Sequence, residues 1–184
     1  TSFSGQDLLK TRIRTGNFIG SDPFSATGDA LLEVASSTGD ILTIDRAYYQ
    51  FPVGESLTAT VGAKVRQDDM LGVWPSSYPS DSILDVLTYA GANAAYNLSM
   101  GAGAGVTYTG DSLSASLLFV SSEAADASQG VLTEQGSDDV TAQLAWTGDN
   151  FTLAAAYTTS DAGNTANTAN SEDYTAVGLS AQYD

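Results

Sequence analysis

The chain has 184 residues, 42% of them apolar, and its 22 acidic and 6 basic side chains give a net charge of −16. This length and composition suit one domain built on a sheet with one buried face, and the shortage of basic residues argues against nucleic-acid binding. The absence of cysteine and histidine excludes disulfides, thiol chemistry, Cys/His metal sites and histidine-based triads.

Strand-like segments separated by turn residues recur along the whole chain. In chain order, the expected strands are a short piece at 2–3, then 8–16, 30–36, 41–51, 57–67, 97–109, 112–120, 139–147, 151–159 and 174–183. A short helix is expected around 82–87. No stretch approaches the ~20 apolar residues of a transmembrane helix, but the strands of a membrane barrel are short and alternating. About ten strands and no long helix predict an all-β antiparallel fold.

The basic residues fall on the polar side of these alternations. In the strand 8–16, for example, Leu9 and Ile13 lie on the face opposite the three basic residues at 10, 12 and 14. This follows because side-chain direction in a strand has a period of two. A sheet with one apolar and one cationic face suits a barrel with lipid outside and water inside. The expected pore-lining residues are Lys10, Arg12, Arg14, Arg46, Lys64 and Arg66.

The later strands alternate in the same way. Leu144 and Trp146 lie opposite Thr141 and Gln143, and the polar positions are small, hydroxylic or amide side chains that leave room for water. The glycines of 101–105 do not form a dinucleotide-binding motif, because no helix follows them. They are expected to give curvature, or space for a loop that folds inward.

An internal repeat marks three tight turns. Residues 108–115 (YTGDSLSA) match 146–153 (WTGDNFTL), and 51–58 is a looser third copy. In each copy an aromatic residue ends one strand, a turn containing Gly and an acidic residue reverses the chain, and a large apolar residue starts the next strand. Aromatic residues are thus expected to gather at the rim formed by these turns, as in the girdle of a barrel. They are Phe51, Tyr108, Trp146, Phe151 and Tyr183.

The short turns alternate with long polar loops at 68–96, 121–138 and 159–173. Short turns at one end and long loops at the other are typical of outer-membrane barrels. One segment, 17–29, departs from this pattern, because it is long and yet falls at the short-turn end when the expected strands are counted.

Three segments resemble cyanobacterial outer-membrane porins: 2–17 (SFSGQDLLKTRIRTGN), 44–54 (IDRAYYQFPVG) with the strand that follows it, and 101–108 (GAGAGVTY). The resemblance covers most of the chain with gaps. That family is related to carbohydrate-selective porins and is often labelled as iron-uptake porins. The resemblance implies a homotrimeric barrel of about 16 strands in the outer membrane lipid bilayer. It also implies an N-terminal S-layer-homology domain that binds the cell wall, and passive diffusion of small hydrophilic solutes such as inorganic ions, iron or sugars.

Two departures from the family bear on domain organisation. The S-layer-homology domain is absent from the sequence, and Asp184 is not the terminal aromatic residue expected where a barrel ends. Residues 1–184 are therefore expected to be one porin barrel segment with about ten of about 16 strands. Closure of ten strands into a small barrel of their own is the alternative, since that number is even.

The 68–96 segment is the expected constriction loop. Its acidic residues could face Lys64 and Arg66 across a narrow opening, and a mobile surface loop is the alternative. Trp74 and Tyr78 could stack on sugar rings, as the related family suggests, or anchor the loop. The loop residues singled out are Asp68, Asp69, Trp74, Tyr78, Asp81 and Asp85.

No catalytic residues, metal site or cofactor are predicted. The carboxylates lie mostly in turns and loops, where burial does little to tune a pKa, and the Asp138-Asp139 pair lacks the ligand spacing of a calcium site. The sequence therefore predicts no enzyme. The alternative to a porin is a soluble or secreted β-sandwich that acts as a binding or structural module, because sandwich strands also alternate.

Overall fold

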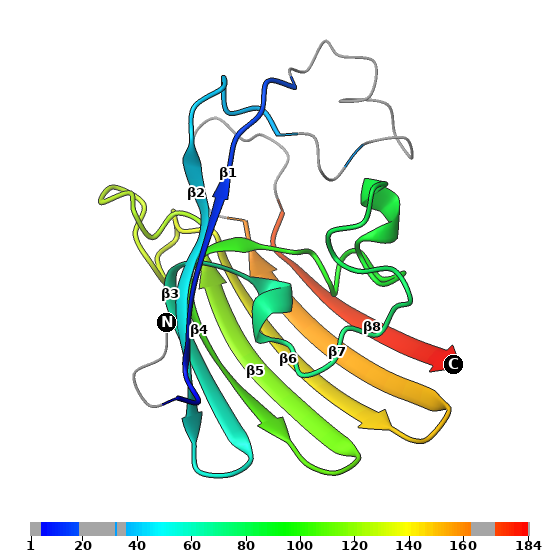
Figure 1. Cartoon of the computed structure of the whole chain (residues 1–184). Helices are drawn as coiled ribbons and strands as arrows, with labels where there is room; N and C mark the ends of the chain where they lie inside the picture. Colours follow the sequence, from blue (N-terminus) through cyan, green and yellow to red (C-terminus); the bar gives the residue numbers. More distant parts are fainter. Residues whose placement is uncertain (1–4, 19–31, 33–35, 163–171, 184) are drawn as a thin grey trace.

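The computed structural model describes residues 5–18, 32, 36–162 and 172–183. The described strands form one eight-stranded antiparallel sheet in which every strand pairs with its neighbours in the chain (Figure 1). This confirms the predicted all-β antiparallel class. Among the described residues the sheet is not closed, and β1 and β8 are its two edges. The strands are β1 Leu8–Arg14, β2 Thr43–Val53, β3 Leu57–Arg66, β4 Met100–Thr109, β5 Leu113–Ser121, β6 Asp138–Thr147, β7 Phe151–Asp161 and β8 Tyr174–Tyr183.

All eight strands coincide with expected strands to within a few residues at each end. The expected piece at 2–3 lies outside the described residues, as does most of 30–36. Of the latter, Leu32 makes only an isolated bridge to Leu84. The expected helix around 82–87 is a single 3-10 turn, η3 Asp85–Leu87, and another, η2 Gln67–Met70, follows β3 directly.

The connections divide between the two ends of the sheet. The turns β2–β3, β4–β5 and β6–β7 are short and lie at one end, and the long connections lie at the other (Figure 1). Most of 17–29, the segment expected to depart from this pattern, lies outside the described residues. Because β1 pairs directly with β2, the chain leaves β1 at Arg14 and enters β2 at Thr43, both at the long-loop end.

The repeated turns share their hydrogen bonds. Gly110 N–H donates to the Leu113 carbonyl and Gly148 N–H to the Phe151 carbonyl, both at 2.9 Å. A Cβ at Gly148 would lie 2.6 Å from the ring of Trp146, so the glycine lets that ring pack over the turn. The centroids of the Trp146 and Phe151 rings are 4.9 Å apart. Aromatic residues thus gather at the short-turn end, as the repeat predicts.

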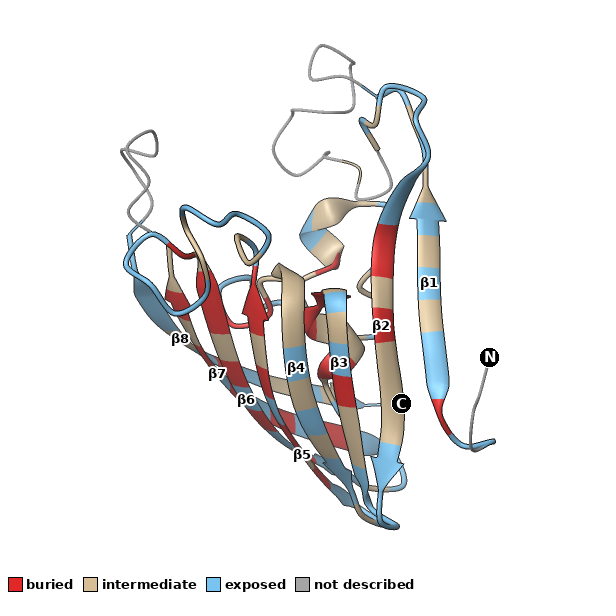
Figure 2. Ribbon diagram, turned by 90° about the vertical axis from the view of Figure 1, so that its left-hand side faces the viewer, coloured by how far each residue is buried: buried red, intermediate tan, exposed pale blue. Residues whose placement is uncertain are grey.

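The two faces of the sheet differ in chemistry and in exposure, and Figure 2 shows buried and more exposed residues alternating along the later strands. On the concave face, Thr141 is 0% and Gln143 4% exposed, whereas Leu144 is 54% and Trp146 40% exposed on the convex face. The concave face is buried because residues 67–99, here called the inner segment, lie against it (Figures 1 and 2). The predicted alternation of faces in β6 is confirmed, and the apolar face is the exposed one.

The core lies between the concave face and the inner segment. One cluster combines Tyr48, Val65, Met70, Leu118 and Val120. A second cluster contains Ala95, Tyr96 and Ala156. Glycines in the strands permit this approach, since a Cβ at Gly105 would lie 3.0 Å from Met70 Sδ and one at Gly178 would lie 2.9 Å from Ala95 Cβ. The expectation that glycines of 101–105 make room for an inward loop is confirmed at Gly105.

Candidate functional site

Polar side chains of the sheet hold the backbone of the inner segment. Thr107 Oγ1 donates to the Met70 carbonyl at 2.7 Å, and Thr158 Oγ1 donates to the Ala95 carbonyl at 2.7 Å. Gln143 forms two bonds to Val73, donating to its carbonyl at 2.9 Å and accepting from its N–H at 3.3 Å. These bonds satisfy backbone groups that burial would otherwise leave unpaired. The small polar positions of β4, β6 and β7 therefore hold protein backbone where the sequence predicts space for water.

The aromatic residues of the inner segment have different environments. Trp74 packs edge-to-face on Tyr96 with 5.5 Å between ring centroids, and its indole N–H donates to the Tyr78 carbonyl at 2.9 Å. Trp74 therefore anchors the segment, which is the second of the two roles considered for it. The Tyr78 ring is half exposed, and its role in stacking on sugars stays a prediction.

Five cations and four carboxylates meet on the concave face, where β1, β2 and the end of β3 face the start of the inner segment. This group is called the ion-pair network below. It brings together most of the predicted pore-lining and constriction residues. Its members are Lys10, Arg12, Arg14, Arg46 and Arg66 with Asp45, Asp68, Asp69 and Asp81.

Asp69 is the centre of the network. Its carboxylate, on a side chain only 7% exposed, accepts from Lys10 Nζ at 2.9 Å and Arg46 Nε at 2.7 Å. It also accepts from the Tyr48 hydroxyl at 2.9 Å and from the Arg66 backbone N–H at 3.1 Å. The first turn of the inner segment is thereby joined to β1, β2 and β3 at once.

Arg66 binds two further carboxylates of the inner segment. It donates to Asp68 from Nε at 2.6 Å and from Nη2 at 2.9 Å, and to Asp81 from Nη2 at 3.0 Å. Arg12 Nη1 donates to Asp81 at 2.7 Å. Burial raises the pKa of Asp68, but the bonds and charge of Arg66 outweigh it and leave that pKa below its ordinary value. The pKa of Asp81 is also lowered: burial raises it, and the bond from Arg12 with the charge of Arg66 prevails.

Asp45 joins the network through an irregularity in the sheet. The register of β1 and β2 shifts between Arg12 and Ile13, so Arg12 pairs with Arg46 while Ile13 pairs with Ile44, and Asp45 is the additional residue. A β-bulge of this kind redirects a side chain. Asp45 accepts from Arg12 Nε and from Arg46 Nη1, and Arg14 Nε lies 3.7 Å from it.

Lys64 is a correction to the predicted basic face. A second register shift, between Ala47 and Tyr48, pairs Lys64 with Ala47, which itself pairs with Thr11 on the convex face. Ala63 is the additional residue at this shift, so Ala63 and Lys64 together oppose Ala47. Lys64 therefore lies away from Asp68 and Asp69, which pair with Arg66 and Lys10 instead, while its neighbour Val65 is turned inward and buried.

Asp85 does not contact the cations among the described residues. It accepts from the Tyr89 hydroxyl at 3.1 and 3.2 Å. The acids expected to face Arg66 are Asp68 and Asp81, which form direct ion pairs with it. Lys64 and Asp85 do not take part in these pairs. With five cations and four carboxylates, the network has a net charge of +1.

The sequence interpretation missed Asp45, Tyr48 and Gln143 as parts of this site. For Asp45 a signal exists, because the consecutive charged residues Asp45-Arg46 break the alternation of β2 and so indicate a bulge. Gln143 offers no comparable signal, since its partner Val73 is 70 residues away in the chain.

Comparison with protein-family models, curated proteins and solved structures found no match. The resemblance to cyanobacterial porins therefore stays a prediction. Among the described residues, no helix is long and apolar enough to cross a membrane. The same residues contain no cluster of three or more acidic side chains placed to hold a metal ion.

The lowered pKa values of Asp68 and Asp81 predict how the inner segment responds to acid. A carboxyl with a lowered folded-state pKa stabilises the fold above its unfolded-state value, here 3.8, and this stabilisation is lost as the pH falls through the folded-state pKa. In Trp146→Phe, which leaves Trp74 as the reporter, emission should stay constant from pH 7 to about 4 and shift to the red below that. A red shift already complete at about pH 5.5 would contradict the assignment.

Proposed function

We propose that the chain forms the wall of a transmembrane β-barrel porin in an outer membrane, through which small hydrophilic solutes diffuse passively. The inner segment and the ion-pair network narrow the path. The observation that carries the proposal is the inverted burial of the sheet, whose apolar face is exposed while its polar face is buried. A barrel in lipid requires this arrangement, because its outside meets hydrocarbon and its inside meets water.

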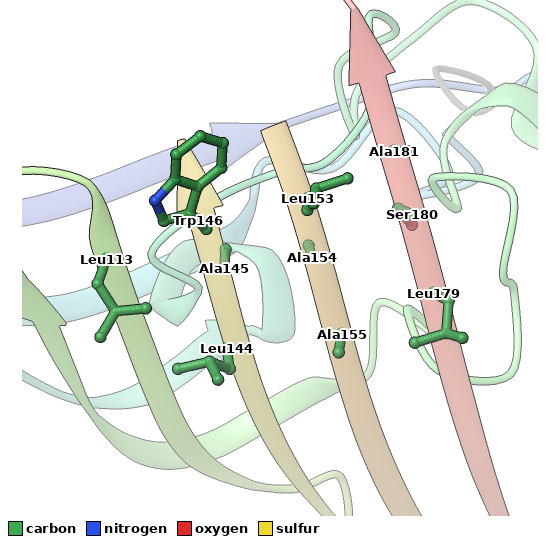
Figure 3. A pocket seen from close by; sticks show the side chains of 10 residues that line it. All are labelled: Leu113, Leu144, Ala145, Trp146, Leu153, Ala154, Ala155, Leu179, Ser180 and Ala181. Carbon is green, nitrogen blue, oxygen red and sulfur yellow. The ribbon is translucent and has the colours of Figure 1, made fainter. Parts of the chain in front are cut away.

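The convex face provides a continuous apolar surface across the later strands. Figure 3 shows a shallow groove on it between β5 and β8, with Leu113, Leu144, Trp146 and Leu179 among its lining residues. Along β7, outward positions run from Phe151 to Thr159, which is about 27 Å of strand. Tilted as barrel strands are, this is comparable with the apolar band of ~25 Å in outer-membrane barrels.

The placement of charge agrees with the same orientation. The five cations of the network lie on the concave face, paired with carboxylates. A lipid-facing Arg or Lys costs about 2–4 kcal/mol at the midplane of the bilayer but about 0–1 kcal/mol near its surface. Lys64 is on the convex face near the long-loop end of β3, where that cost is small.

A soluble β-sandwich fits the exposures less well. Its two sheets bury their apolar faces against each other, whereas here the described strands form one sheet and the apolar face is uncovered. The trimeric state, a cell-wall-binding domain and the passage of iron, sugars or inorganic ions enter the proposal through the resemblance alone. The net charge of +1 in the network favours anions among the solutes.

The two tryptophans allow a direct test, because one lies on each face. Trp146 is on the convex face and Trp74 is packed on Tyr96 inside. In bilayers of brominated lipids, which quench nearby indoles, we expect Trp146 to lose most of its emission and Trp74 little. The measurement compares Trp74→Phe, which reports Trp146, with Trp146→Phe, which reports Trp74.

The same pair of variants separates the alternatives. Equal and weak quenching of both tryptophans, in a protein that stays monodisperse without detergent, would show that the convex face does not meet lipid. That outcome would return the chain to the β-sandwich reading. Strong quenching of Trp74 would instead contradict the position of the inner segment.

A further inference from the structure

A polar cavity of about 220 Å³ opens on the concave side at the long-loop end of the sheet. Taking about 30 Å³ for each water, it has room for roughly seven waters. It lies beside the ion-pair network and shares four residues with it. The lining residues are Arg12, Arg14, Asp45, Arg66, Tyr89, Asn97, Leu98 and Met100.

Two guanidinium groups of this lining have unused donors. Arg14 donates no side-chain hydrogen bond to a described residue, and its nearest carboxylate contact is 3.7 Å from Nε to Asp45. Arg12 binds Asp45 and Asp81 through Nε and Nη1, but its buried Nη2 has no acceptor among the described residues. A buried donor without an acceptor, such as Arg12 Nη2, is costly, so Arg12 and the neighbouring Arg14 are suited to an acceptor that the protein itself does not supply.

Two other polar groups of the lining already have partners within the protein. Asn97 is committed, because its amide donates to Asp139 at 2.9 Å and to the Tyr174 hydroxyl at 3.0 Å. The Asp45 carboxylate is held by Arg12 and Arg46. The cavity therefore has three guanidinium groups against one carboxylate in its lining, which favours an anion over a cation.

We propose that this cavity binds a small oxyanion of the phosphate or sulfate class, held chiefly by Arg14 and supported by Arg12. The planar fork of a guanidinium matches the spacing of two oxyanion oxygens, which a monatomic anion such as chloride cannot reproduce. As a statement about which solute crosses the membrane, this inference rests on the proposed function. The binding itself does not require conduction.

Arg14 is the residue to change, because its removal breaks no hydrogen bond of the network. The folded protein in detergent is titrated calorimetrically with inorganic phosphate and with sulfate, at constant ionic strength set by chloride. We expect one saturable site, weakened about tenfold or more in Arg14→Gln and less in Arg14→Lys, which keeps the charge but not the fork. Lys64→Gln, which removes the same charge from the convex face, is the matched control and should bind as the unchanged protein does.

Two results would overturn the site: no saturable binding of either oxyanion by the folded protein, or equal affinities in Arg14→Gln and Lys64→Gln. Its failure is distinguishable from failure of the proposed function. Channels without oxyanion binding would refute the site alone. Oxyanion binding by a protein that forms no channels would support the site and refute the channel.

Discussion

Asp69→Ala is expected to lower the free energy of unfolding by about 3–5 kcal/mol, the usual cost of removing one partner of a buried ion pair. The carboxylate accepts from Lys10, Arg46, Tyr48 and the backbone of Arg66. The largest consequence falls on Arg46, whose side chain is only 2% exposed and cannot reach water when Asp69 is lost. Urea-induced unfolding of the protein in detergent micelles measures the change.

Two further variants make this result specific. Asp85→Ala removes a carboxylate from the same segment, but one bonded only to the Tyr89 hydroxyl among the described residues, so the loss should be within about 1 kcal/mol. Asp69→Ala combined with Arg46→Met should recover part of the loss, because it removes the buried guanidinium whose Nε has lost its acceptor. If Asp69→Ala and Asp85→Ala were equally mild, Asp69 would not be the centre of the network.

Removal of the middle of the inner segment is expected to have the largest effect on conduction. Replacing residues 74–94 with a short Gly-Ser linker should raise the single-channel conductance by about twofold or more, because the segment fills part of the concave face. Such a linker can join Val73 to Ala95, since the Gln143 amide bonds both the Val73 carbonyl and the hydroxyl of Tyr96, the residue that follows Ala95. Conductance in planar bilayers is the measurement.

The matched control shortens the long connection between β5 and β6 within 122–137. Bonds in this connection join its residues to one another, as between Gly136 N–H and the Thr133 carbonyl at 3.0 Å. The trimmed protein should keep the conductance of the unchanged one. If both deletions raised the conductance equally, the inner segment would not be the constriction.

The strands and their faces follow from local sequence. Period-two alternation predicts that Leu144 and Trp146 lie opposite Thr141 and Gln143, and the structure confirms it. The repeated turns predict where β4 and β6 end and where β5 and β7 begin to within a residue or two. Each turn is specified by a glycine and its neighbours. The count of expected strands placed 17–29 at the short-turn end because it included a strand at 30–36, most of which lies outside the described residues.

Alternation alone does not predict the bulge in β3, whereas the bulge in β2 has a sequence signal. An inserted residue changes which face the following side chains occupy, and this reversed the predicted faces of Lys64 and Val65 in β3. In the sequence, only the consecutive charged residues Asp45-Arg46 indicate such a bulge. Residues 62–65, Gly-Ala-Lys-Val, read as regular alternation.

The sequence predicts that acidic residues of the inner segment meet basic residues of the sheet, but it does not predict which cation each carboxylate binds. Acidic residues after β3 were expected to face basic residues of the sheet, and Asp68, Asp69 and Asp81 do so. Which cation each one binds depends on contacts between residues as far apart as Arg12 and Asp81, 69 positions along the chain. Those contacts depend both on which strands pair and on how the inner segment folds against the sheet. Neither can be read from the periodicity of the sequence.

The most direct test of the central claim is conductance. The whole protein as its cell makes it would be reconstituted in a planar bilayer and its current recorded across a salt gradient. We expect stepwise channels whose reversal potential shows a preference for anions, because the ion-pair network on the concave face has a net positive charge. Absence of channels, in a protein that stays soluble and monodisperse in plain buffer, would contradict it.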